Sequence, residues 1–124
     1  MITTRILHAL LPLAIVTIAA AGCTADDKRE LGEQDIRDSL QASADRVLDE
    51  RATSADGALR CTARISTDGV ATGSCSGTTA GGVPFVVRYD GTADIDAETC
   101  TATMAVTIDG VAQADRAGVD CFAG

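Results

Sequence analysis

Four cysteines flank two Asp-Gly pairs in the C-terminal half of the chain, and they constrain its fold more than any other feature. The chain contains two Phe, one Tyr and no Trp, so a core has to be built mainly from aliphatic and small side chains. Such a core is marginal in about 100 residues, and cross-links are the usual remedy. An even number of cysteines in an exported chain predicts two disulfides, here among Cys61, Cys75, Cys100 and Cys121.

The positions of the Asp-Gly pairs indicate how the cysteines are joined, because these dipeptides favour tight hairpin turns. A hairpin centred on residues 68–69 places residues opposite each other when their numbers add up to about 137. Cys61 and Cys75 add up to 136. For a hairpin centred on residues 109–110 the two numbers should add up to about 219. The numbers of Cys100 and Cys121 add up to 221, and a β-bulge can account for the difference of two. We therefore predict the pairs Cys61–Cys75 and Cys100–Cys121, with crossed links between the hairpins as the alternative.

The hydrophobic pattern predicts an α+β domain, in which one amphipathic helix packs on an antiparallel meander of four or five strands. From Glu33 to Arg51 the apolar residues recur at helical spacing, at Ile36, Leu40, Ala44, Val47 and Leu48. Beyond residue 58 the pattern alternates, as in strands, at 59–65, 83–89 and 100–108. Phe85 and Tyr89 share a strand face with Val83 and Val87, so we expect them in the core. Asp90-Gly91 allows two interpretations, a turn or a bulge within one long strand.

The first 30 residues predict export and a lipid anchor. Arg5 precedes an apolar run over residues 6–21, which is typical of a secretory signal peptide and short for a membrane span. Ala20-Ala21-Gly22-Cys23 resembles the lipobox of bacterial lipoproteins, in which the cysteine receives a diacylglyceryl group and becomes the mature N-terminus. Two or more acyl chains anchor a protein stably. Ordinary cleavage after Ala21 and an uncleaved anchor helix are the alternatives.

These patterns divide the chain into a lipoprotein signal peptide (1–22), a charged tether (23–30) and a single domain (31–124). Cleavage of the predicted signal peptide would remove Arg5. Nine Lys and Arg side chains would then remain against 18 Asp and Glu, which gives a net charge of −9. An acidic domain is repelled by nucleic acid and by anionic lipid surfaces, so we expect neither as a partner.

Few residue types suited to catalysis are present after residue 22. There is no histidine, Lys28 is the only lysine, and the thiols are expected to be oxidised. Nucleophilic catalysis needs a nucleophile beside a base, so we expect no catalytic site, no cofactor and no zinc site. Asp94, Asp96 and Glu98 alternate along the chain and could together bind calcium, although the spacing is not that of an EF-hand. A solvated acidic face is the simpler interpretation.

The lipobox, the single helix and the segment "LRCTARISTDGVATGSC" (59–75) together resemble small actinobacterial lipoproteins with a short domain of unknown function. The resemblance covers residues 31–90. It implies a lipoprotein, but it brings no known activity. These lipoproteins often carry proline where this chain has Thr62, and lack the Cys100 and Cys121 pair.

We expect a monomeric, non-enzymatic lipoprotein on the outer face of the cell membrane, held there by the lipid on Cys23. It would bind another envelope protein or have a structural role, and the strand edges are candidate interaction surfaces. The alternatives are a carrier of a small ligand or lipid with a pocket between helix and sheet, and a secreted inhibitor of an extracellular enzyme.

Overall fold

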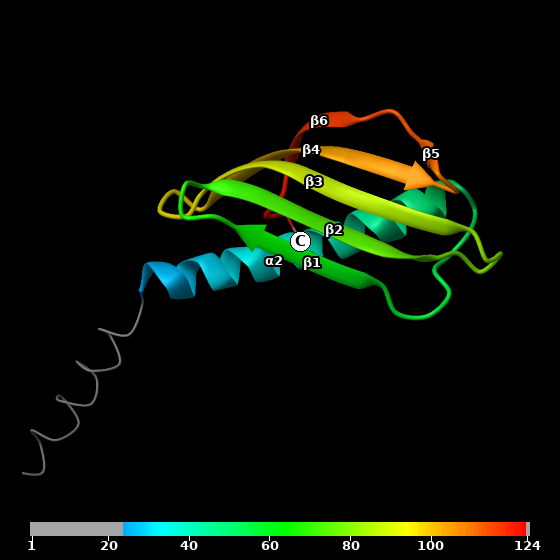
Figure 1. The fold of residues 1–124 in the computed structure, drawn as a ribbon, viewed down its shortest axis with the longest axis horizontal. Helices are drawn as coiled ribbons and strands as arrows, with labels where there is room; N and C mark the ends of the chain where they lie inside the picture. Colours follow the sequence, from blue (N-terminus) through cyan, green and yellow to red (C-terminus); the bar gives the residue numbers. More distant parts are fainter. Residues whose placement is uncertain (1–23, 124) are drawn as a thin grey trace, which may run out of the picture.

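The structure, a computed structural model that describes residues 24–123, is one helix packed on one face of a six-stranded antiparallel sheet (Figure 1). The helix, α2, spans Ala25–Glu50. The strands are β1 (Arg60–Ile65), β2 (Val70–Thr78), β3 (Pro84–Asp94), β4 (Thr99–Ile108), β5 (Val111–Ala112) and β6 (Arg116–Asp120). The α+β class predicted from the sequence is confirmed. The predicted signal peptide (1–22) and Cys23 lie outside the described residues.

The sheet is the expected meander with a short addition at one edge. Its strand order is β1-β2-β3-β4-β5, and β6 also pairs with β4, further along the same edge. The four long strands correspond to the predicted ones. The two short strands arise because the chain after residue 110 returns along β4, leaves it at residues 113–115 and rejoins it as β6.

Three of the four hairpin turns between β1 and β5 contain glycine dipeptides, whereas the β3–β4 turn at residues 95–98 contains no glycine. Asp109 and Gly110 both have positive φ (52° and 75°) and form the two-residue turn between β4 and β5. Gly69 has a φ of 83° in the turn between β1 and β2. Asp90-Gly91, in contrast, lies inside β3 in continuous register with both neighbouring strands, so the turn interpretation is wrong and no bulge is needed.

The helix begins earlier than the sequence pattern predicted. A helix was expected from Glu33 and an extended tether over residues 23–30, whereas residues 25–30 form the first turns of α2. The Thr24 hydroxyl accepts a hydrogen bond from the Asp27 N–H, and the Asp27 carboxylate accepts one from the Thr24 N–H. This capping box, with Asp26 and Asp27 near the positive end of the helix dipole, explains the start of the helix. These turns extend beyond the sheet (Figure 1), so no apolar stripe marks them in the sequence.

The core lies between α2 and the inner face of the sheet. The predicted helix stripe is confirmed, because Ile36, Leu40, Ala44 and Leu48 are at most 1% exposed and Val47 packs partly buried against them. The sheet contributes alternate residues, as predicted, including the completely buried Val87 and the nearly buried Phe85 and Tyr89, with Met104 and Val106.

A polar cluster crosses this core. The Tyr89 hydroxyl lies 3.0 Å from the Ser39 hydroxyl and 2.6 Å from the Ser43 hydroxyl, and all three residues are buried. Tyr89 also donates to the Ser39 carbonyl at 3.3 Å. Because buried polar groups must find partners, this cluster fixes the position of α2 along the sheet.

Both predicted disulfides are confirmed. Cys61 lies directly opposite Cys75 in the β1–β2 pair, with their Cα atoms 4.1 Å apart. Cys100 is joined to Cys121, just after β6, with a Cα separation of 5.2 Å. The register along β4 shifts by one residue between β5 and β6 and by one more between Met104 and Ala102, and together these shifts provide the two-residue offset that the numbering of this pair required.

Candidate binding face

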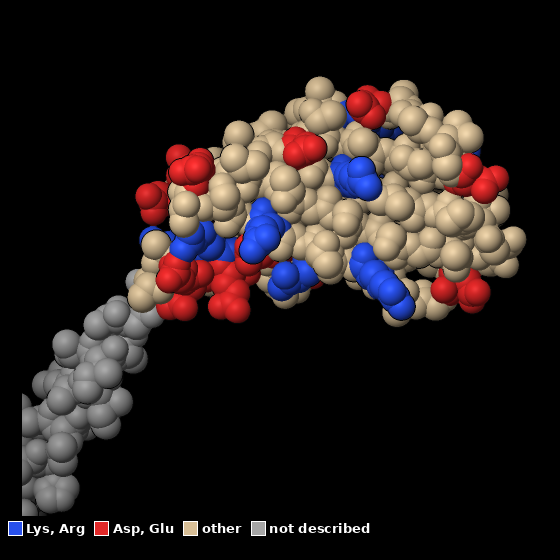
Figure 2. All heavy atoms as spheres, viewed as in Figure 1, with Lys and Arg blue, Asp and Glu red and all other residues tan. Residues whose placement is uncertain are grey.

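Within the part of the chain that the structure describes, no helix covers the outer face of the sheet. Because α2 packs against the opposite side, the outward side chains of β1–β4 meet solvent, and Figure 2 looks onto them. Val70, Val86 and Ala105 are among these outward residues, but most carry hydroxyl or guanidinium groups and none is aromatic: Arg60, Thr62, Arg64, Thr72, Ser74, Ser76, Arg88, Asp90, Thr92, Thr101, Thr103 and Thr107. We call this set the outer face.

Three arginines form a triangle on the outer face. Arg60 and Arg64 lie on β1, four residues apart, which corresponds to about 13 Å along a strand. Arg88 on β3 faces Ser74, which in turn faces Thr62, midway between the other two arginines. With strands about 4.8 Å apart, the Arg88 Cα lies roughly 12 Å from each of the other two Cα atoms.

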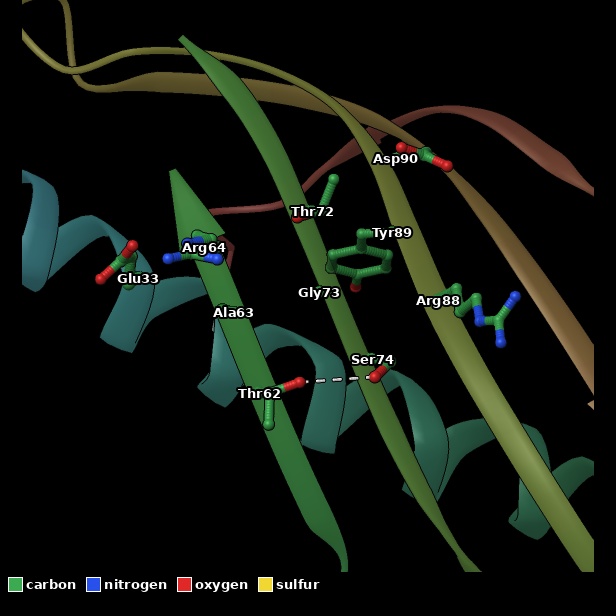
Figure 3. A pocket seen from close by; sticks show the side chains of 10 residues that line it. All are labelled: Glu33, Thr62, Ala63, Arg64, Thr72, Gly73, Ser74, Arg88, Tyr89 and Asp90. Carbon is green, nitrogen blue, oxygen red and sulfur yellow. Dashed lines mark hydrogen bonds between the residues drawn. The ribbon is translucent and has the colours of Figure 1, made fainter. Parts of the chain in front are cut away.

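A pair of hydroxyls occupies the middle of this triangle. The Thr62 and Ser74 hydroxyls lie 3.5 Å apart on neighbouring strands (Figure 3). They form part of the lining of an open hollow of about 710 Å³, which Arg64 and Arg88 also line. Hydroxyl groups both donate and accept hydrogen bonds, so they can serve an oxygen-rich ligand in either direction.

The charge of the outer face is opposite to that of the rest of the chain. Within residues 24–123 the ion pairs are Lys28–Asp96, Arg29–Asp26 and Arg116–Glu50, and none involves the three arginines of the triangle. Nine of the chain's 18 acidic residues lie in α2, which packs on the other side of the sheet, and one of them, Glu33, reaches the β1 edge and lines the same hollow as Arg64 and Arg88. Asp90 borders the triangle. It lies on β3 opposite Thr72 of β2, and Thr72 in turn lies opposite Arg64 of β1. The three arginines are exposed, and their charges remain available to a ligand.

A disulfide and close packing against α2 support the strands beneath the triangle. The Cys61–Cys75 disulfide joins β1 to β2 on the inner side, and Cys75 is completely buried. Gly73 lies under the triangle, where a Cβ would come within 2.7 Å of Leu40 Cδ1. The helix therefore approaches the sheet closely at this point, and the backbone that carries Thr62 and Ser74 is held from below.

The acidic residues that were considered as calcium ligands do not form a site. Residues 95–98 are the turn between β3 and β4, so Asp94, Asp96 and Glu98 do not alternate along an extended segment as the sequence suggested. The Asp94 carboxylate instead accepts the Ala97 N–H at 3.1 Å. Within the part of the chain that the structure describes, no group of three or more His, Cys, Asp or Glu side chains could hold a metal ion.

The strand edge at β1 is partly occupied by a side chain of the helix. The Glu33 carboxylate accepts a hydrogen bond from the Ile65 backbone N–H at 2.8 Å. Arg37 donates to the Gln34 side chain. Charged residues on an edge strand, here Arg60 and Arg64, are a common means of discouraging pairing with another chain. The edge is thus a weaker candidate for interaction than the outer face.

Only two of the three arginines of the triangle could be placed together from the sequence. Alternation over 60–65 places Arg60 and Arg64 together on the face opposite the core, but nothing in the sequence places Arg88 between them. That requires the register of β2 with both of its neighbours. Of the sequence-predicted site residues, the four disulfide cysteines are where they were expected.

Comparison with known proteins gives no relative from which a function could be transferred. No family model matches the chain, and no curated protein and no solved structure matches it either.

Proposed function

We propose that the protein is an exported, lipid-anchored and non-enzymatic binding module of the cell envelope. In this proposal Cys23 carries the lipid, and the outer face of the sheet is presented to partners in the space outside the membrane. The observation that carries the proposal is the start of α2 at Ala25, two residues after the predicted lipid-bearing cysteine.

The early start of the helix fits an anchored domain. With Thr24 as the N-cap, one residue separates the helix from Cys23, in place of the tether that the sequence suggested. An acyl group on Cys23 would hold the N-terminus of α2 at the membrane surface, and the cap would keep that turn helical. The folded domain would then stay close to the bilayer with a restricted orientation.

The two disulfides support export. Such cross-links form and persist in oxidising, extracytoplasmic environments. Between Thr24 and Ala123, no helix is long and apolar enough to cross a membrane.

Binding by a surface fits this domain better than transport of a ligand in its interior. The middle of the space between α2 and the sheet is filled by side chains such as Leu40, Leu48 and Val87, which are at most 1% exposed. A carrier would need a cavity there. The hollow that remains beside the first turns of α2, about 440 Å³, lies at the end of the sheet, near Ile95 and Phe122. The outer face, in contrast, offers charge and hydroxyl groups directly to solvent.

The anchor is tested by detergent phase partitioning of the native chain and a Cys23→Ser variant, both expressed in a bacterium that processes lipoproteins. The native protein should partition into the detergent phase and the variant into the aqueous phase, because acylation requires the thiol. Thr24→Ser is the matched control, since it keeps Cys23 and supplies an equivalent N-cap hydroxyl. Equal partitioning of native protein and Cys23→Ser would refute the anchor.

A further inference from the structure

We infer that the Arg60–Arg64–Arg88 triangle binds an extended acidic polysaccharide, a sugar polymer that carries carboxylate or phosphate groups. This inference rests on the proposed function only in that export brings the outer face into contact with such polymers.

The geometry of the triangle suits several oxyanions along one chain. An arginine side chain reaches about 6–7 Å from its Cα to its guanidinium group, by ordinary bond lengths. Arginines whose Cα atoms are roughly 12–13 Å apart can therefore converge on one anionic group above Thr62 and Ser74, or hold neighbouring groups on one polymer. The planar guanidinium binds carboxylate and phosphate through two parallel hydrogen bonds, which a lysine cannot do.

The hydroxyl groups of the face favour a sugar polymer over a bare polyanion. Thr62 and Ser74 lie between the arginines, and Thr72 lies between Arg64 and Asp90; all three can exchange hydrogen bonds with sugar hydroxyls. The hollow is open to solvent, so it fits a chain that lies across the strands better than a small ligand that requires enclosure.

The same face is poorly suited to nucleic acid. Single strands are bound largely by stacking of bases on aromatic side chains, and the three aromatic residues of the chain are not on this face. Phe85 and Tyr89 are buried in the core, and Phe122 follows β6 at the C-terminal end. A duplex would also approach the acidic residues at the margins of the domain, which Figure 2 shows at both ends.

The net negative charge of the domain does not prevent local binding of an anion. At physiological salt the Debye length is about 8 Å, so charges separated by more than that are largely screened. Most carboxylates of α2 lie on the far side of the sheet, with the helix and the sheet between them and the arginines. Glu33 and Asp90 are exceptions: Glu33 lines the hollow together with Arg64 and Arg88, and Asp90 lies on the outer face itself, two residues from Arg88.

Binding is measured with the full mature protein in a nonionic detergent, by fluorescence anisotropy of labelled polymers at fixed salt. The probes are polygalacturonate, which carries carboxylates, phosphomannan, which carries phosphates, neutral dextran, and single-stranded DNA of matched charge. We expect one or both acidic polysaccharides to bind. Comparison of polygalacturonate with phosphomannan then shows whether carboxylate or phosphate is the anionic group that is recognised. Dextran should not bind, and DNA should bind more weakly than the better polysaccharide.

Substitutions on the outer face are expected either to weaken or to strengthen polysaccharide binding. Arg88→Gln should weaken binding about two- to fivefold, and the triple Gln variant of the triangle at least about tenfold, as expected for exposed charge pairs. Asp90→Asn should strengthen binding by about two- to fivefold. Arg46→Gln is the matched control, because it makes the same charge change on an exposed part of α2. All of these side chains are exposed, so thermal unfolding should be unchanged.

The inference is overturned if neither acidic polysaccharide binds, if DNA binds more tightly than both, or if the triple variant loses no more affinity than Arg46→Gln. These outcomes are independent of the anchor. An acylated protein that fails to bind would refute the ligand alone, and a protein that binds without acylation would refute the anchor alone.

Discussion

Replacement of Gly73 by alanine should destabilise the domain, because this glycine allows α2 to approach the sheet. A Cβ at this position would lie 2.7 Å from Leu40 Cδ1, 3.1 Å from Ile36 Cγ2 and 3.0 Å from the Thr62 carbonyl oxygen. The side-chain atoms can shift, but the carbonyl belongs to the neighbouring strand. Overpacking of this kind costs about 1–3 kcal/mol. Alanine recovers about 0.5–1 kcal/mol by restricting the unfolded chain, so we expect a net loss of roughly 1–2 kcal/mol.

Urea unfolding followed by circular dichroism measures this loss as a lower midpoint with an unchanged slope. Gly81→Ala is the matched control, because the nearest atom to a Cβ there is the Thr79 hydroxyl oxygen at 3.8 Å. Its stability should stay within about 0.5 kcal/mol of the native protein. The contact with Leu40 can be isolated by repeating Gly73→Ala in a Leu40→Ala background, where it should cost less. A Gly73→Ala protein as stable as the native one would refute the close approach of helix and sheet.

Three further substitutions test other parts of the fold. Tyr89→Phe removes the hydroxyl that two buried serines of α2 contact, and should cost about 1–2 kcal/mol in urea unfolding; no loss would mean that the serines find other partners. Removing the Cys100–Cys121 disulfide as a double serine variant should cost about 3 kcal/mol, since it closes a loop with a sequence separation of 21. It should also speed amide exchange over residues 116–120, and unchanged exchange there would contradict the role of this link in holding β6. Thr24→Ala should lower stability by about 1 kcal/mol and fray only the first turn of α2, which amide exchange resolves.

The cysteine pairing was predictable because register in a hairpin follows from the position of its turn. The Asp109-Gly110 turn fixed the pairing of β4 with the returning chain, and the two-residue discrepancy for Cys100 and Cys121 appears in the structure as a register shift. The helix stripe was predictable for a similar reason, since residues that face one core recur at the helical period. Both predictions depend on local rules that a single sequence contains.

The start of the helix was missed because the first turns of α2 bury no large apolar side chain. Leu31 is 68% exposed, so periodicity gives no signal before residue 36. The available signal was the cap, Thr24 followed three residues later by Asp27, but the usual capping box has Glu or Gln at that position. The hydrogen bonds of Tyr89 with the helix serines and the arrangement of the three arginines were also missed. They depend on contacts between distant segments, which one sequence does not specify.

The intact mass of the protein extracted from membranes tests the central claim most directly. The account predicts a chain that begins at Cys23, carries a diacylglyceryl group and contains both disulfides. Such a mass would place the first turn of α2 directly at the lipid. A chain that begins at Gly22 without lipid would contradict the account, because the domain would then be freely secreted with Cys23 as an unpaired thiol.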